Sequence, residues 1–348
     1  MSHPYADLPA AAFWRSAVVE TAPEALRDLG TPKFRLDAQS AIATAGSCFA
    51  QHIGQALRGA GLHVLDAEPA PPKCPPQVAR AYGYGVYSAR YGNIYSSRQL
   101  VQLLQDAVGA VVDPAAIWPQ GARFHDALRP SIEPGGFASV AEALALRHAH
   151  LARVRALFTR ASHFVFTLGL TECWADRDSG RVYPTCPGVV AGVFDPARHQ
   201  LVNLAWPEVM ADLTAVRALL RGLNPNLRMI LTVSPVPLTA TASGCHVLQA
   251  SAGSKATLRA AAGAFAEAHA DVDYFPSYEI ITNPAAAGRF FAPNLREVTP
   301  EGVCAVMQAF LAAHGLTPQA DLPPVDLAEK AGPADVICEE ILLEAFRK

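Results

Sequence analysis

Short apolar runs alternate with amphipathic stretches along most of the chain. Five of the runs have the length and the side chains of buried strands, and they span residues 41–47, 62–67, 163–169, 227–235 and 272–280. The stretches between them repeat apolar residues every three or four positions, which predicts helices over 48–60, 97–108, 139–161, 207–223, 254–270 and 300–314. Gly61 and Gly315 follow two of these stretches, where helices favour a glycine.

This alternation predicts the fold class. Strands that alternate with helices pair in parallel through right-handed crossovers, and both faces of the resulting sheet are covered. We therefore expect a three-layer α/β/α sandwich with a mainly parallel five-stranded sheet in a flavodoxin-like order. Ligands of such sheets bind beyond the carboxyl ends of the strands, so the candidate site lies just after the five runs.

Two connections and the end of the chain do not fit this alternation. Residues 68–96 and 171–206 are rich in proline, glycine and aromatic residues and are too long for plain turns, so we expect them to wall a pocket. Residues 1–315 then form one catalytic domain. Residues 316–348 are interpreted as a Pro-rich linker and an acidic amphipathic helix, which docks on the body or joins two copies in a homodimer.

Composition narrows the class of partner. The 348 residues are 51% hydrophobic and 17% charged, which allows a large core. A formal net charge of -3 argues against nucleic acid or an anionic membrane surface as the main partner. The chain has no apolar window long enough to span a membrane and no export signal, which predicts a cytoplasmic location. Its 7 cysteines form no CxxC pairs, which argues against a disulfide framework and against a zinc knuckle. The leading interpretation includes no metal and no cofactor.

The sequence Thr-Ala-Gly-Ser-Cys-Phe marks the point where the first predicted strand becomes a helix. One interpretation of Ser47 is an N-cap, because a serine hydroxyl accepts the first amides of a helix. The other is a nucleophile at the catalytic edge of the sheet, where helix amides and the helix dipole stabilise an oxyanion. Gly46 permits a tight turn there. The sequence lacks the second glycine of a GxSxG elbow, so another serine-hydrolase arrangement is required.

Several blocks resemble one known family. The stretch GSCFA at 46–50 resembles the signature of the GSCFA-domain family, a branch of the SGNH (GDSL-like) hydrolases. Further blocks similar to its pattern are YGVYSARYGNIYSSRQL at 84–100, TLGLTE at 167–172, TVSPVPLTAT at 232–241 and YFPSYEI at 274–280. The resemblance implies a single three-layer domain in which Ser47 is the nucleophile.

The resemblance also implies an oxyanion site made of the nucleophile's amide, a glycine amide of the second block and an asparagine of the third. Gly92 and Asn93 are the candidates in the second block, and a simple turn before the next helix is the alternative. In the third block, Thr171 stands where the asparagine is expected and Glu172 where the acid is expected. We expect Glu172 to line the pocket, the alternative being a helix cap.

The general base is where the chain departs from the family pattern. SGNH enzymes usually carry Asp-x-x-His before the last helix, and this chain has Asn294 and Glu297 at those positions. A carboxylate with an ordinary pKa of about 4 is a weak base toward a serine hydroxyl. His246 follows the fourth predicted strand at the same edge and is predicted to be the general base or a substrate contact. Glu279 is the candidate acid that orients it, with Glu172 and Glu297 as alternatives.

These interpretations predict a serine-dependent esterase or O-acyltransferase with an acyl-Ser47 intermediate. Its substrate is predicted to be a small-molecule or saccharide ester. Aromatic residues of the two insertions either stack on sugar rings or anchor the loops: Tyr82, Tyr84, Tyr87, Tyr91, Trp174 and Tyr183. Three alternatives stay open: a binding protein that kept the fold, a thiol nucleophile at Cys48, and a metal site made of Glu172, Glu279 and His246.

Overall fold

The central sheet of the protein has 4 parallel strands in the order β1-β4-β8-β9. These strands are β1 (Ile42–Gly46), β4 (His163–Leu168), β8 (Arg228–Val233) and β9 (Val272–Tyr274). They come from a computed structural model that describes residues 3–27, 29–316 and 339–346. The mainly parallel α/β architecture predicted from the sequence is confirmed. Residues 317–338, which include most of the predicted Pro-rich linker and the start of the predicted C-terminal helix, lie outside the described residues.

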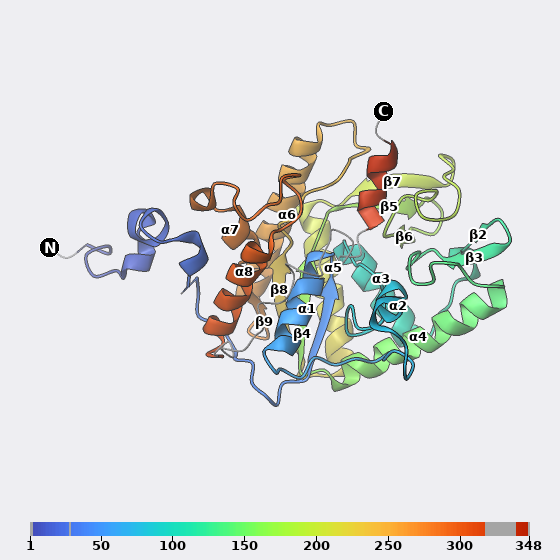
Figure 1. The fold of residues 1–348 in the computed structure, drawn as a ribbon, viewed down its shortest axis with the longest axis horizontal. Helices are drawn as coiled ribbons and strands as arrows, with labels where there is room; N and C mark the ends of the chain where they lie inside the picture. The colour runs from blue at the N-terminus through green and yellow to red at the C-terminus, as the bar shows by residue number, and fades with distance from the viewer. Residues whose placement is uncertain (1–2, 28, 317–338, 347–348) are drawn as a thin grey trace.

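Helices cover both faces of this sheet (Figure 1). One face packs against α1 (Phe49–Gly59) and α8 (Pro300–Ala313). The other packs against α3 (Ser97–Gly109), α4 (Val140–Arg160), α5 (Trp206–Leu223) and α6 (Val247–Ala268). Side chains of β4 alternate between the two faces of the sheet. Phe164 and Phe166 belong to the hydrophobic cluster on one face, and Val165 belongs to the cluster on the other. The six predicted helices are confirmed.

One of the five predicted strands is absent from the central sheet. Residues 62–67 form only an isolated parallel bridge, between Val64 and Ile42. The reason lies at the outer edge of β1, which a later segment occupies beyond this bridge. The Thr44 amide donates to the Ser88 hydroxyl over 3.0 Å, and the Ile94 amide donates to the Gly46 carbonyl over 2.9 Å. The first long connection, residues 68–96, therefore occupies the edge of β1 along which residues 62–67 were expected to pair. This places residues 88–94 near the end of β1.

The last predicted strand, residues 272–280, is also shorter than expected. Strand β9 ends at Tyr274, and α7 (Ser277–Thr282) follows directly. The Phe275 amide still donates to Leu231 in β8, but Pro276 has no amide hydrogen and stands at the N-cap of α7. Glu279 therefore lies in a helix rather than at the end of a strand.

The insertions form their own small elements. Residues 171–206 contain an antiparallel sheet of β6 (Val182–Tyr183), β5 (Glu172–Asp176) and β7 (His199–Asn203), in that order. A hairpin of β2 (Ile117–Gln120) and β3 (Arg123–Asp126) precedes α4, and α2 (Pro76–Ala81) lies in the first insertion. The short helical turns are Ala10–Ala12, Arg15–Val19, Pro23–Ala25, Pro114–Ala116, Pro284–Ala286 and η6 (Glu339–Phe346).

Two further predictions concern the ends and the surface of the fold. Within the described ranges, no helix is both long and apolar enough to cross a membrane. The described part of the predicted C-terminal helix is the 3-10 helix η6, drawn in red beside the β5–β7 sheet in Figure 1. It lies against residues of its own chain, and the predicted homodimer stays a prediction.

Candidate functional site

Ser47 lies at the carboxyl end of β1, one residue before the N-cap of α1. Its amide donates to the Thr167 carbonyl over 3.2 Å, so β1 and β4 stay paired up to the turn. Gly46 has a φ of +145°, and a Cβ atom there would lie 2.5 Å from the Thr167 carbonyl oxygen. Only glycine fits this approach, and it allows the strand to turn into α1 at the serine.

The Ser47 hydroxyl is buried, with a relative exposure of 3% for the residue. Among the described residues its Oγ has no hydrogen-bond partner, and Cys48 occupies the N-cap of α1 without a side-chain cap bond. The capping interpretation of Ser47 is therefore wrong. A buried hydroxyl without a partner costs free energy, so its position at this strand end calls for an explanation.

Asn93 lies beside the serine because Tyr87 connects the two. The Tyr87 hydroxyl lies 3.0 Å from the Ser47 carbonyl oxygen and 2.5 Å from Oδ1 of Asn93. Nε2 of Gln51, on α1, donates to the same Oδ1 over 3.2 Å. Both donors fix the Asn93 carboxamide with its oxygen toward α1, so its Nδ2 points out of this cluster as a hydrogen-bond donor.

The turn that carries Asn93 is held from two sides. Gly92 has a φ of +70°, which favours glycine. After it, the Ile94 amide pairs with Gly46 at the end of β1. Before it, Nη1 of the buried Arg129 donates to the Arg90 carbonyl over 3.1 Å. The second block thus places Gly92 and Asn93 at the end of β1, and their oxyanion role stays a prediction.

Gly169 connects the end of β4 to the serine. A Cβ atom at Gly169 would lie 2.8 Å from Cβ of Ser47, so only a glycine allows this contact. The amides of Gly169 and Leu170 both donate to the Tyr95 carbonyl, over 3.0 and 2.9 Å. Nζ of Lys255, a buried lysine on α6, donates to the Gly169 carbonyl over 2.7 Å. Lys255 is a basic side chain near the site that the sequence analysis did not single out.

Thr171 faces another partner. Its hydroxyl donates to Oδ1 of Asn203, at the end of β7, over 2.6 Å, and its amide donates to Ser254 on α6 over 2.9 Å. A threonine hydroxyl has one hydrogen to donate. In this arrangement Thr171 therefore joins β5, β7 and α6, and its hydrogen is not directed to an oxyanion at Ser47.

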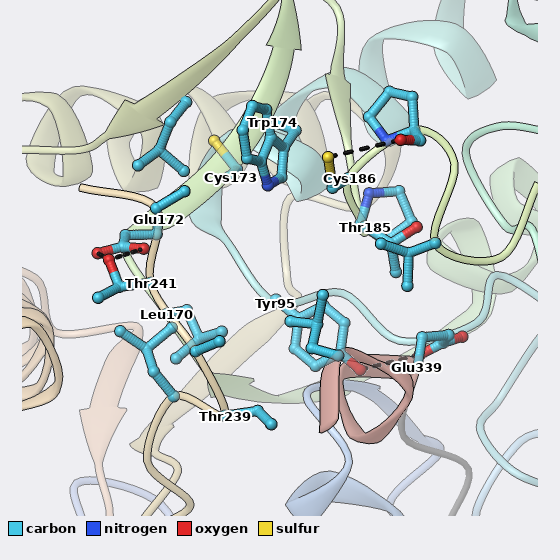
Figure 2. Close-up of a pocket in the computed structure, with 18 of the residues that line it drawn as sticks. Tyr95, Leu170, Glu172, Cys173, Trp174, Thr185, Cys186, Thr239, Thr241 and Glu339 are labelled. Atoms are coloured by element: carbon cyan, nitrogen blue, oxygen red, sulfur yellow. Dashed lines mark hydrogen bonds between the residues drawn. The ribbon is translucent and has the colours of Figure 1, made fainter. Parts of the chain in front are cut away.

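Glu172 opens β5 and lines a cavity, as the sequence analysis expects, rather than capping a helix. The Thr241 hydroxyl lies 2.8 and 2.9 Å from its two carboxylate oxygens. Burial raises the pKa of Glu172, and the hydrogen bond from Thr241 opposes that shift. Figure 2 shows this pair on the side of the cavity opposite Glu339.

The cavity itself has a volume of about 700 Å³ and mainly apolar walls. Residues of the second long connection, 171–206, form one wall. The loop after β8 and the helix η6 form the others (Figure 2). Apolar side chains in the lining include Leu170, Trp174, Val189, Phe194, Leu201 and Leu238. Tyr95 connects the cavity to the serine, because its ring lines the cavity and its carbonyl accepts from Gly169.

The predicted base and its partners lie elsewhere. His246 is exposed, and its Nδ1 accepts from the Leu248 amide as the N-cap of α6, which explains why this helix begins earlier than predicted. Glu279 pairs with Arg259 and accepts a 2.8 Å hydrogen bond from the Tyr274 hydroxyl. The structure therefore places Glu279 with a cation rather than with His246.

The loop that replaces Asp-x-x-His forms a small turn of its own. Oδ1 of Asn294 accepts from the amides of Arg296 and Glu297, both over 3.0 Å. Across the described residues, no hydrogen bond joins the side chain of His246, Glu279 or Glu297 to Ser47. Gly92 and Asn93 thus lie near the serine, whereas among the described residues none donates to or accepts from its hydroxyl.

The residues of the alternative metal site, Glu172, Glu279 and His246, do not lie together. No group of three or more His, Cys, Asp or Glu side chains with the spacing of a metal site occurs in the described part of the chain. Glu172 is bonded to Thr241 and Glu279 to Arg259, on different elements. The three residues named from the sequence therefore do not form a metal site in this structure.

The aromatic residues of the insertions have several roles. Tyr87 and Tyr91 are buried and bond to backbone carbonyls of Ser47 and Thr44, so they anchor the loop rather than offer a stacking surface. Tyr183 is also buried, against Trp118. Of the six aromatics named from the sequence, Trp174 lines the large cavity, with an edge-on contact to Phe194.

Comparison with known proteins yields one family match. A family model described as the GSCFA family matches residues 41–310. The matched range begins at β1 and ends in α8, so it includes Ser47, the second block with Asn93 and the strand end at Gly169. No curated protein matches the chain.

Proposed function

The chain belongs to the GSCFA family, and we propose that it is a serine-dependent esterase or O-acyltransferase with Ser47 as its nucleophile. The observation that carries the proposal is the buried Ser47 hydroxyl, which has no partner among the described residues and lies at the carboxyl end of β1. The proposal includes kinship with SGNH hydrolases, which is supported by the parallel sheet and by the nucleophile position after its first strand.

The reaction that we propose begins with attack of Ser47 Oγ on the carbonyl carbon of an ester. The carbonyl oxygen becomes an oxyanion, which the Nδ2 donor of Asn93 and the first turn of α1 stabilise. The ester C–O bond then breaks, and the alkoxide leaves with the proton released by the serine. Water or an acceptor alcohol next attacks the acyl-serine, which regenerates the hydroxyl and releases an acid or a new ester.

The chemistry of the cavity supports a proposal for the rest of the substrate. The cavity beside Tyr95 is mainly apolar, which suits the hydrocarbon part of an acyl group or of an alcohol. Glu172 and Thr241 give its far side one polar contact. A saccharide substrate and a cytoplasmic location stay predictions from the sequence.

Reaction with an alkyl fluorophosphonate tests the proposal directly. We expect one adduct per chain by intact mass, and peptide mapping is expected to place it on Ser47, because the reagent phosphorylates activated serines. Heat-denatured protein is the control and is expected to remain unlabelled. If the folded protein forms no adduct, the serine is not a nucleophile and the alternative of a ligand-binding protein takes its place.

His246 remains our proposed general base, and its substitution is expected to lower the rate of labelling about 100-fold. The role requires the loop after β8 to close over Ser47 when the reagent binds, because His246 now caps α6 in contact with solvent. His246→Asn is the matched variant, since asparagine still caps the helix but cannot act as a base. Equal losses in His246→Ala and His246→Asn support the role. Wild-type rates in both variants rule it out.

A further inference from the structure

The helix η6 places an acidic side chain in the candidate active site. Glu339 is 4% exposed, and its Oε2 accepts a 2.8 Å hydrogen bond from the Tyr95 hydroxyl and a second hydrogen bond from Nδ2 of Asn93. Figure 2 shows the Glu339 side chain reaching toward Tyr95 from the red segment. A residue near the end of the chain thus holds the donor of Asn93 that the proposed reaction uses.

Glu339 also lies between two cavities. It lines the large cavity beside Tyr95 and a small one of about 20 Å³ that is lined by Gln51, Tyr87 and Asn93. Leu343 and Phe346, farther along η6, line the large cavity as well. Glu339 therefore lies between the polar cluster of Gln51, Tyr87 and Asn93 and the apolar space that suits a substrate.

The carboxylate of Glu339 resembles the group that a substrate would place there. The Asn93 carboxamide oxygen accepts from Tyr87 and Gln51, which orients the group so that Nδ2 donates to Glu339. A negatively charged oxygen at that position occupies the place of an oxyanion on an acyl group. Two hydrogen bonds to a charged acceptor are stronger than bonds between neutral groups, and they hold Glu339 at this place.

We propose that η6 is an internal inhibitor of the Ser47 site, in which Glu339 occupies the position of the substrate's carbonyl oxygen. This inference rests on the proposed function, because it names how that same site is regulated. Two apolar side chains of the segment are open to solvent, since Leu342 is 44% exposed and Phe346 is 64% exposed, and this favours release. An acyl substrate whose apolar chain enters the cavity displaces the segment by competing for Asn93 and Tyr95.

Labelling rates of the full-length protein test the inference. We expect Glu339→Ala to react with the alkyl fluorophosphonate at least about tenfold faster than wild type, because the donors of Asn93 and Tyr95 become available. Glu339→Gln is expected to be intermediate, since its amide oxygen still accepts a hydrogen bond but carries no charge. Glu267→Ala is the control, an exposed carboxylate near the far end of α6, and is expected to match wild type. If Glu339→Ala labels at the wild-type rate or more slowly, η6 is not an inhibitor.

Amide hydrogen exchange separates this inference from the proposed function. We expect residues 339–346 to exchange at least about tenfold faster in Glu339→Ala than in wild type, because the variant loses both hydrogen bonds to the site. Unchanged exchange overturns the inference whatever the labelling shows. Labelling of both proteins at one rate, together with faster exchange, overturns the inhibitor role and leaves the proposed function standing. Faster exchange without labelling of any protein overturns the proposed function, and the inhibitor role with it.

Discussion

Replacement of Ser47 by alanine is expected to lower the rate of ester cleavage at least about 10³-fold and, at the same time, to raise the stability of the protein. The loss follows because the variant has no oxygen to attack the carbonyl carbon. The gain follows because Oγ of Ser47 is buried without a partner among the described residues. An unsatisfied buried polar atom costs about 1–3 kcal/mol, and alanine keeps the Cβ contact with Gly169 while removing that atom.

Urea unfolding of Ser47→Ala and of a matched serine variant measures the stability half of this prediction. Ser88→Ala is the match, because Ser88 is also buried beside β1 but its hydroxyl accepts from the Thr44 amide over 3.0 Å. We expect Ser88→Ala to lose about 1–2 kcal/mol of unfolding free energy and Ser47→Ala to gain unfolding free energy. A loss of similar size in both variants would show that the Ser47 hydroxyl has a structural partner after all. Activity retained in Ser47→Ala would remove the serine from the mechanism.

Much of the fold was predictable because local patterns determine it. The apolar runs that became β1, β4 and β8 are almost fully buried, and strands covered on both faces have no need of polar positions. The helices between them follow from their apolar periodicity. The position of Ser47 was predictable from the same local pattern. A parallel strand that ends in Gly-Ser before a helix places the serine at the edge of the sheet where ligands usually bind.

The departures arise where distant segments compete for one place. Residues 62–67 resemble a strand, but the edge of β1 that they need is held by Ser88 and Ile94, and no local pattern records such competition. Glu279 resembled a residue at a strand end until Pro276 redirected the chain into α7. A proline inside the predicted run was the signal that the strand ends earlier.

The polar surroundings of Ser47 were the least predictable part of the site. The sequence analysis expected Tyr87 to anchor a loop or to stack on a sugar, because it lies in an aromatic-rich connection. In the structure its hydroxyl connects Ser47 with Asn93. Lys255 looked like an ordinary helix residue, although its amine is buried against Gly169. Glu339 is farther still in sequence from the residues that it bonds. These contacts join elements that only the folded topology brings together, and periodicity carries no information about them.

Substitution of Gly46 by alanine is expected to destabilise the protein by about 2–5 kcal/mol and to abolish labelling of Ser47. Its φ of +145° is unfavourable for any residue with a Cβ atom. That atom would also lie 2.5 Å from the carbonyl oxygen and 2.8 Å from Cβ of Thr167. The strand end must then move away from β4, and the serine moves with it. Urea unfolding measures the first effect and fluorophosphonate labelling below the unfolding transition measures the second.

Gly222→Ala is the matched control for this substitution. Gly222 lies in the last turn of α5, where a Cβ atom would meet nothing within 4 Å. Alanine there is expected to be neutral or to stabilise by up to about 1 kcal/mol, because it favours the helix. The contrast isolates the strain at the strand end from the general effect of removing a glycine. If both variants unfold at the same urea concentration as wild type, the close approach of Gly46 to Thr167 is not a fixed feature. The position of Ser47 would then have to depend on the turn at Asn93 and on the contact with Gly169 instead.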